Sequence, residues 1–305
     1  MNPREEKRRE IRGSLLLLLG SMIWGAAFAA QRAGMDHVGP FTFSGVRMLL
    51  AGLVLTPAAL LFGEKKPERP DPRTQRRAGG MCGLFLCAAT LLQQAGLVDT
   101  GAGKAGFITA LYVVLVPVAG RLLFRRKPGK AVWLGVALAV LALFLLCVPA
   151  GGFRLEGGDL MLIGCAICFT GQILCVDYFA PKVDGIRLAR DEFLVTGVLS
   201  MILALCTEEI SWMGIRGALI PILYAGILSG AVGYTLQILG QRDVNPTLAS
   251  LLMCLESVFA VLTGALLLGE RLTGREAAGC VLMFAAVLLA QAAPWLRKTS
   301  RRKPD

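Results

Sequence analysis

The sequence contains an internal repeat at a spacing of about 144 residues, and this repeat limits the folds that the chain can adopt. The clearest copies are residues 105–135 and 249–279, which align without a gap. The pattern Leu-Gln-x-x-Gly-x-x-Asp occurs at residues 92–99 and again at 236–243. Most of the protein therefore consists of two copies of one sequence unit, and its fold is expected to contain two similar halves.

The repeated unit is strongly apolar, which identifies the class of protein. The hydrophobic fraction is 55% and only 17% of residues are charged, whereas a soluble domain carries about 25% charged residues. Apolar runs of about 20 residues, the length needed to cross a bilayer as a helix, recur along the whole chain. The sequence therefore predicts a multi-pass membrane protein whose partner is the lipid bilayer. The net charge of +11 does not indicate nucleic-acid binding, because Lys and Arg concentrate in short loops between the runs.

The apolar runs predict ten membrane-spanning helices, five in each copy of the repeat. Helices are favoured over a barrel because the runs lack the alternation of membrane strands. The predicted organisation is a charged head at 1–11, a first repeat at 12–149, a second repeat at 157–293 and a basic tail at 294–305. The predicted spans are 12–30, 39–62, 78–98, 104–124, 131–149, 158–179, 190–206, 215–241, 246–268 and 274–293. The first run has features of a cleaved signal peptide, but it matches the sixth run and is expected to be retained.

The distribution of Lys and Arg predicts how these helices are oriented. With the N-terminus in the cytoplasm, 24 of the 32 basic residues fall in cytoplasmic segments and 6 in external ones. Positive charge marks the cytoplasmic side, so both termini are predicted to be cytoplasmic. Since each repeat has an odd number of spans, the second copy enters the membrane from the opposite side. The predicted fold class is thus an all-α membrane protein built from two inverted five-helix repeats, a design in which solutes bind between the halves near the midplane.

Glu256 and Arg47 lie inside predicted spans, where charge is costly and marks candidate functional sites. Glu256 is ten residues into the ninth span. It is either a partner for a substrate ammonium, a proton carrier, or a neutral acid bonded to a neighbouring helix. Arg47 is about eight residues into the second span. It is expected to bind an anionic group, to pair with Glu256, to reach the end of a helix, or to extend its side chain to the membrane interface.

Uncharged polar and aromatic residues within the spans complete the candidate substrate site. Gln93 and Gln237 are repeat partners, and Tyr112 occupies the position equivalent to Glu256. For the two glutamines, the alternative role is hydrogen bonding between helices. For Trp24 in the first span, the alternative is a position that faces lipid. A kink is expected at Pro117. The full set of candidate substrate-binding residues is Trp24, Arg47, Gln93, Gln94, Thr109, Tyr112, Gln172, Tyr234, Gln237 and Glu256.

The nine cysteines all fall within predicted spans, which argues against a framework of extracellular disulfides. Cys165 and Cys168 form a C-x-x-C pair, but the chain has no second such pair and one histidine, His37. We therefore interpret the cysteines as small packing residues and expect no metal and no cofactor. The sequence shows none of the patterns that would indicate an enzyme: it has no cluster of His, Asp or Glu and no hydrolase or ATP-binding motif.

The runs GFITALYVVLVP at 106–117 and LLLGERLTGREAAGCVLMFAAVLL at 266–289, with Trp24-Gly25 and Arg47 in the first two spans, resemble the EamA family of the drug/metabolite transporter superfamily. The resemblance covers residues 12 to 293. Many members carry Leu-Glu-Pro in the ninth span, whereas here Leu255-Glu256 precedes Ser257, so the kink made by that proline is not predicted.

The resemblance implies a secondary transporter that moves a small polar metabolite, an amino acid or related solute, out of the cell by alternating access. It also implies an inner-membrane location. Proton coupling through Glu256 is a further hypothesis, and both a monomer and a homodimer remain open. A membrane-embedded enzyme and a translocator of lipids or hydrophobic solutes are the alternatives.

Overall fold

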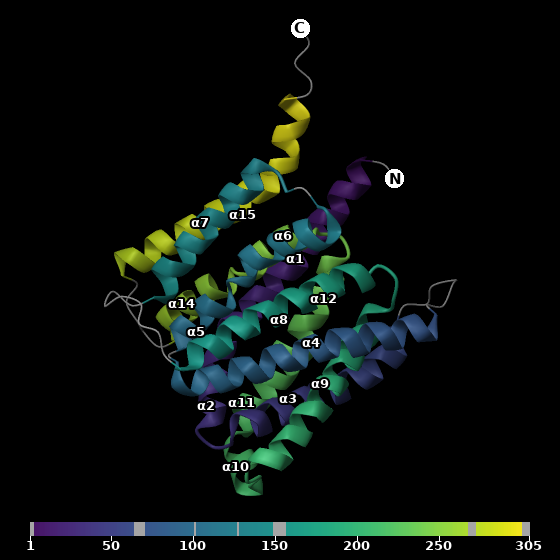
Figure 1. Cartoon of the computed structure of the whole chain (residues 1–305), viewed down its shortest axis with the longest axis vertical. Coiled ribbons are helices and arrows are strands. Elements are labelled where there is room, and N and C mark those ends of the chain that lie inside the picture. The colour runs from purple at the N-terminus through teal and green to yellow at the C-terminus, as the bar shows by residue number, and fades with distance from the viewer. Residues whose placement is uncertain are drawn as a thin grey trace.

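The computed structural model describes residues 3–63, 71–100, 102–126, 128–148, 157–267 and 273–300, and all regular structure within these ranges is helical (Figure 1). The helices of the first half are α1 (Pro3–Gly25), α2 (Ala27–Met35), α3 (Pro40–Leu61), α4 (Pro72–Asp99), α5 (Ala102–Thr109), α6 (Tyr112–Phe124) and α7 (Lys130–Cys147). Those of the second half are α8 (Gly157–Phe179), α9 (Gly185–Thr207), α10 (Trp212–Gly217), α11 (Leu219–Leu223), the π-helix η1 (Tyr224–Tyr234), α12 (Thr235–Gln241), α13 (Pro246–Met253), α14 (Glu256–Leu267) and α15 (Gly274–Ser300).

Nine segments of the described residues are long and apolar enough to cross a membrane. They correspond to every predicted span except the seventh. That span coincides with α9, which has 23 residues but carries Arg187, Arg190, Asp191 and Glu192 near its start. The multi-pass membrane class is therefore supported, while the tenth span and the inverted arrangement stay predictions.

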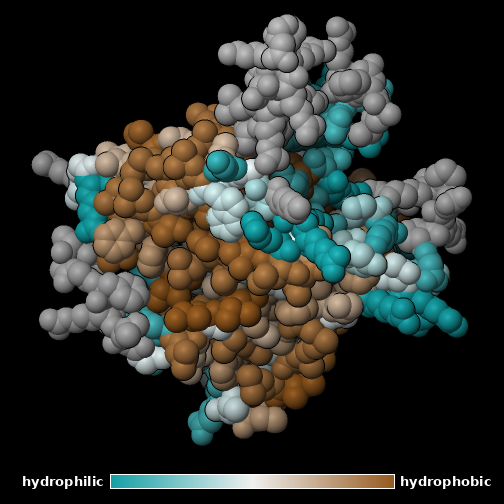
Figure 2. Space-filling model, turned by 45° about the horizontal axis from the view of Figure 1, so that its top comes forward, coloured by the Kyte–Doolittle hydropathy of each residue, from teal (hydrophilic) through white to brown (hydrophobic). Residues whose placement is uncertain are grey.

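The surface of the bundle fits a lipid environment. Large apolar side chains are exposed along several helices, among them Leu60, Leu122, Leu160 and Ile220, each at least 74% exposed. Figure 2 shows a broad hydrophobic face, with hydrophilic residues gathered toward one side. Water would disfavour so much contiguous apolar surface, so these faces are those that contact lipid.

Three helix pairs form the frame of the bundle. Helix α3 packs along α9, α4 along α8, and α7 along α15. In Figure 1, α7 and α15 lie together at one edge, and α3, α9 and α10 lie at the other. Each pair joins the first half of the chain to the second, so neither half forms a separate domain.

Glycines set the close approach of α7 and α15 in a reciprocal way. A methyl group built on Gly135 would lie 3.0 Å from the carbonyl oxygen of Ala286. A methyl group on Gly279, its repeat partner, would lie 3.1 Å from the carbonyl oxygen of Ala142. Since Ala142 and Ala286 are themselves repeat partners, the same contact occurs twice with the halves exchanged.

The predicted fourth and ninth spans are both interrupted in the middle. The first is interrupted between α5 and α6 at Ala110 and Leu111, and the second between α13 and α14 at Cys254 and Leu255. The thiol of Cys254 donates to the carbonyl of Ala110 at 3.8 Å, so the two interruptions meet. Pro117 is not the cause, because it lies within α6, well after the first interruption. The kink expected at Pro117 within α6 stays a prediction, and the ninth span is interrupted without a proline.

Two adjacent glycines of α4 provide a matched test of its packing. A methyl group on Gly79 would lie 2.4 Å from Cβ of Asp191 on α9, whereas one on Gly80 would meet nothing within 4 Å. Alanine gains about 1 kcal/mol over glycine inside a helix. We expect Gly80→Ala to stabilise the protein by up to about 1 kcal/mol and Gly79→Ala to destabilise it by about 1–2 kcal/mol. Thermal unfolding in detergent would measure both, and equal effects would contradict the α4–α9 contact.

Candidate functional site

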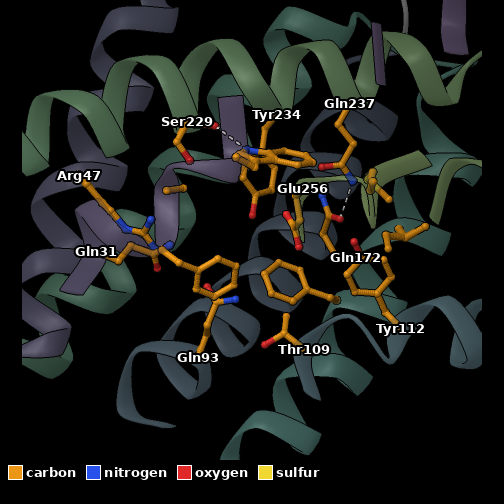
Figure 3. A pocket seen from close by; sticks show the side chains of 16 residues that line it. Gln31, Arg47, Gln93, Thr109, Tyr112, Gln172, Ser229, Tyr234, Gln237 and Glu256 are labelled. Carbon is orange, nitrogen blue, oxygen red and sulfur yellow. Dashed lines mark hydrogen bonds between the residues drawn. The ribbon is translucent and has the colours of Figure 1, made fainter. Parts of the chain in front are cut away.

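A cavity of about 590 Å³, including the space where it opens, lies between the two halves of the chain. Apolar walls and a few polar groups line the cavity (Figure 3). The lining residues are Trp24, Ala27, Phe28, Gln31, Arg47, Gln93, Thr109, Tyr112, Phe169, Gln172, Ile173, Ser229, Tyr234, Gln237, Met253 and Glu256.

Nine of the ten candidate residues from the sequence line this one cavity. Gln94 is the exception. It is fully buried and its amide donates to the sulfur of Met35 at 3.1 Å. Successive helix residues differ by about 100° in direction, so Gln93 faces the cavity and Gln94 faces away from it. Gln94 therefore does not line this cavity, and the substrate-binding role of the candidates remains a prediction.

Arg47 of α3 is an unpaired cation in the cavity wall. The residue is 4% exposed, so it does not extend to the surface of the bundle. Its guanidinium lies 5.5 Å from the centre of the Phe43 ring, and its Nε has no hydrogen-bond partner. Among the described residues no carboxylate pairs with it. A buried guanidinium without an acceptor is unfavourable, so this group is available for an anion that enters the cavity.

Glu256 is the carboxyl group of the same cavity and the first residue of α14. The described part of the chain offers it no hydrogen bond and no ion pair, and it does not pair with Arg47. A helix N-terminus carries partial positive charge that favours an anion. Tyr112, its repeat partner, is the first residue of α6 and also lines the cavity. The two interrupted spans thus begin their second segments at the cavity.

Trp24 forms one wall of the cavity and does not face lipid, since it is 8% exposed. Its Nε1 donates to the carbonyl oxygen of Ser229 at 3.0 Å, and its ring packs edge-on against Tyr234 with centroids 5.1 Å apart. The carbonyl belongs to η1, where the wider turn of a π-helix changes the backbone geometry. A methyl group on Gly233 would lie 2.7 Å from Nε1 of Trp24, so glycine is needed for this contact.

Amide side chains form a connected network on another wall. Gln237 donates to Oε1 of Gln172 at 3.1 Å and to Oε1 of Gln241 at 3.0 Å, and Gln241 donates to the carbonyl of Ile173 at 3.2 Å. Figure 3 shows Gln172 and Gln237 near Glu256, with Arg47 and Gln31 on a different side of the cavity. The described residues contain no group of three His, Cys, Asp or Glu side chains that could hold a metal.

Sequence reasoning missed several residues of the cavity. Gln31 is buried, and its Oε1 has no partner. It follows Trp24, Ala27 and Phe28 at the i, i+3, i+4, i+7 spacing of one helix face, a signal that extends past the predicted end of the first span. Ser229 lines the cavity from the π-helix η1, and the sequence shows no pattern that predicts a π-helix.

Comparison with known proteins identifies the family. A family model described as the EamA-like transporter family matches residues 11–148 and 156–291. The chain belongs to the EamA-like transporter family. The resemblance inferred from the sequence is thus confirmed, and a general role as a membrane transporter follows from membership.

Similar members are also named as transporters. An uncharacterized transporter of Archaeoglobus fulgidus is 28% identical over 92% of this chain and 86% of that protein. The uncharacterized inner membrane transporter YedA of Escherichia coli K12 is 28% identical over 90% of this chain and 91% of its own. A probable amino-acid metabolite efflux pump of Salmonella typhimurium is 23% identical over 94% of this chain and 97% of that protein. A crystal structure with 19% identity has a TM-score of 0.77 over 92% of this chain and 96% of that one, which shows a shared fold.

Proposed function

We propose that the protein is a secondary transporter that exports an amino acid or a closely related small polar solute by alternating access. The observation that carries this proposal is the cavity between the halves, which holds one unpaired cation, Arg47, and one unpaired carboxyl group, Glu256. The name of the Salmonella relative, an amino-acid metabolite efflux pump, supports both the solute class and the direction.

The chemistry of the cavity favours a solute with two opposite charges. An amino acid offers a carboxylate to Arg47, whose planar guanidinium binds carboxylates with paired hydrogen bonds. It also offers an ammonium group to Glu256. The solute thereby provides a partner of opposite charge for each of these two side chains, which the described part of the protein does not. The aromatic rings of Trp24, Tyr112 and Tyr234 give the solute side chain an apolar surface.

Alternating access requires two halves that are related by symmetry, and the packing supports inverted repeats. The α7–α15 contact and the α3–α9 contact each occur twice, with the roles of the two halves reversed. In the α3–α9 contact, Leu49 packs on Gly197, and Leu194 packs on Gly52. In the same way, Gly20 approaches Leu236 and Gly164 approaches Leu92. Two such halves have alternative packings of similar energy, which is the basis of inward-open and outward-open states.

We also propose that α9 is the tenth span, oriented with the others. It packs along α3 and α4, and two of the four charged residues near its start, Arg190 and Asp191, pair with each other. Helix α1 begins and α15 ends on the same side of the bundle (Figure 1), as an even number of spans requires. The excess of Lys and Arg in the connecting segments assigns that side to the cytoplasm.

Exchange in proteoliposomes tests the proposed function. Vesicles loaded with unlabelled L-amino acids should take up a labelled L-amino acid mixture faster than protein-free vesicles. Methyl esters, which lack the carboxylate, and N-acetyl amino acids, which lack the ammonium, should compete at least about tenfold more weakly, because each loses one charged contact. If no exchange occurred, or if both analogues competed as strongly as the unmodified amino acids, the proposed solute class would be overturned.

The ammonium contact predicts the effect of removing the cavity carboxyl. Glu256→Gln should weaken exchange of amino acids by about tenfold to a hundredfold, while N-acetyl amino acids, which lack the ammonium, lose nothing further. Glu6→Gln, at an exposed position of α1, is the control and should behave as wild type. If Glu256→Gln lowered the competition by amino acids and by N-acetyl amino acids alike, the assigned contact would be wrong.

A further inference from the structure

A second carboxyl group, Glu192 of α9, lies behind the cavity wall and was not a candidate from the sequence. It is fully buried. Its Oε2 lies 3.5 Å from Nε2 of Gln172, at the long limit of a hydrogen bond, and its Oε1 has no partner. The charged neighbours on the same helix, Arg190 and Asp191, pair with each other. Glu192 is thus an inner carboxyl group with one weak contact.

The elements around Glu192 offer it no compensating charge. The titratable groups near it are Cys82 of α4, Cys175 of α8 and Tyr234 of η1, none of them a cation. Helix α3 carries a single charged residue, Arg47, and α12 faces this region with the neutral amides of Gln237 and Gln241. Among the described residues no cation forms an ion pair with Glu192. An ionised carboxylate here would lack both water and a partner, so the resting group holds a proton.

Glu192 is connected to the cavity by hydrogen bonds. Gln172 contacts Glu192 through its Nε2 and accepts from Gln237 through its Oε1. Both glutamines line the cavity beside Glu256. If the proton leaves Glu192, the new carboxylate attracts the Gln172 amide more strongly and adds negative charge next to the cavity. This charge favours a cationic group in the cavity, and an ammonium in the cavity favours loss of the proton in turn, since such coupling is reciprocal.

We propose that Glu192 is the proton-binding site that couples solute movement to the proton gradient, through Gln172 and Gln237. The proton and the ammonium-bearing solute are bound in alternation: Glu192 releases its proton to water when the solute enters, and regains one when the solute leaves. Exchange of one proton for one solute is the result. This assignment rests on the proposed function, and it gives Glu192 the role of proton carrier, while Glu256 contacts the solute.

Transport with and without a pH difference tests the proposal. In proteoliposomes, a difference of one pH unit should let wild type accumulate the labelled L-amino acid mixture about tenfold, the thermodynamic value for one proton per solute. Glu192→Gln should lose this accumulation but keep amino acid exchange at equal pH. The adjacent Asp191→Asn is the matched control and should keep both. Retained pH-driven accumulation in Glu192→Gln would overturn the proposal, as would its loss in Asp191→Asn to the same extent.

A measurement without any solute separates this inference from the proposed function. Infrared spectroscopy of the purified protein should detect a protonated carboxyl band at neutral pH that Glu192→Gln weakens and Asp191→Asn leaves unchanged. If the band is present and no amino acid is exchanged, the solute class fails and the proton site stands. If Glu192→Gln leaves the band unchanged, the proton site fails even where exchange is seen. Should Glu192→Gln not fold, Gln172→Leu must shift the pH at which the band disappears, and an unshifted band overturns the link to the cavity.

Discussion

Replacing Arg47 with glutamine should reduce amino acid exchange by about a hundredfold and leave the protein at least as stable as wild type. The loss follows because the solute carboxylate loses its charged hydrogen bonds, each worth about 1.5–3 kcal/mol. The stability follows because Arg47 is 4% exposed and has no acceptor in the described structure. Removing an uncompensated buried charge removes a cost of folding. The two measurements are exchange in proteoliposomes and thermal unfolding in detergent.

Two further variants separate binding from structure. Arg47→Lys keeps the charge but not the planar fork of donors, so it should restore part of the exchange. Arg32→Gln is the matched control, because Arg32 is exposed and its one hydrogen bond among the described residues goes to the carbonyl of Leu97. If Arg47→Gln lowered the melting temperature and left exchange intact, Arg47 would be a structural residue and the carboxylate contact would have to be abandoned.

Replacing Glu208 with alanine should destabilise the protein by about 2 kcal/mol. Helix α3 begins with Gly39 and Pro40, which supply neither a capping side chain nor a first N–H group. Glu208, at the end of α9, accepts from the backbone N–H groups of Phe41 and Thr42, each at 2.8 Å, and from the Thr42 hydroxyl at 2.6 Å. Carboxylates at helix N-termini are stabilising, and loss of a cap costs about 0.5–2 kcal/mol. Thermal unfolding measures the effect.

The neighbouring residue provides the control for this prediction. Glu209 is exposed, and Glu209→Ala should change the stability by less than about 0.5 kcal/mol. In hydrogen exchange, Glu208→Ala should release the amides of Phe41 and Thr42 and leave those in the middle of α3 protected. Equal stability of the two alanine variants would show that the α3–α9 junction does not depend on Glu208.

The membrane class and most of the cavity residues were predictable because they depend on local rules. A charge or amide inside an apolar span must face the protein interior, which selects Arg47, Gln172 and Glu256 without knowledge of the fold. The repeat then transfers the position of Glu256 to Tyr112. The same rule does not say which of the adjacent amides Gln93 and Gln94 faces the cavity, and it overlooked Glu192, which lies near the charged start of α9.

The sequence by itself determined that the chain is a membrane protein of two similar halves, because apolar length and repetition need no partner to be read. Only the tertiary structure decided where the spans are interrupted and which polar groups remain unpaired. The interruptions at Ala110 and Cys254 occur where the two halves meet, and neither of them contains a proline. That Arg47 and Glu256 have no ion-pair partner is equally a result of packing, because an ion pair depends on the distance between helices, and that distance is set by side chains far apart in the chain.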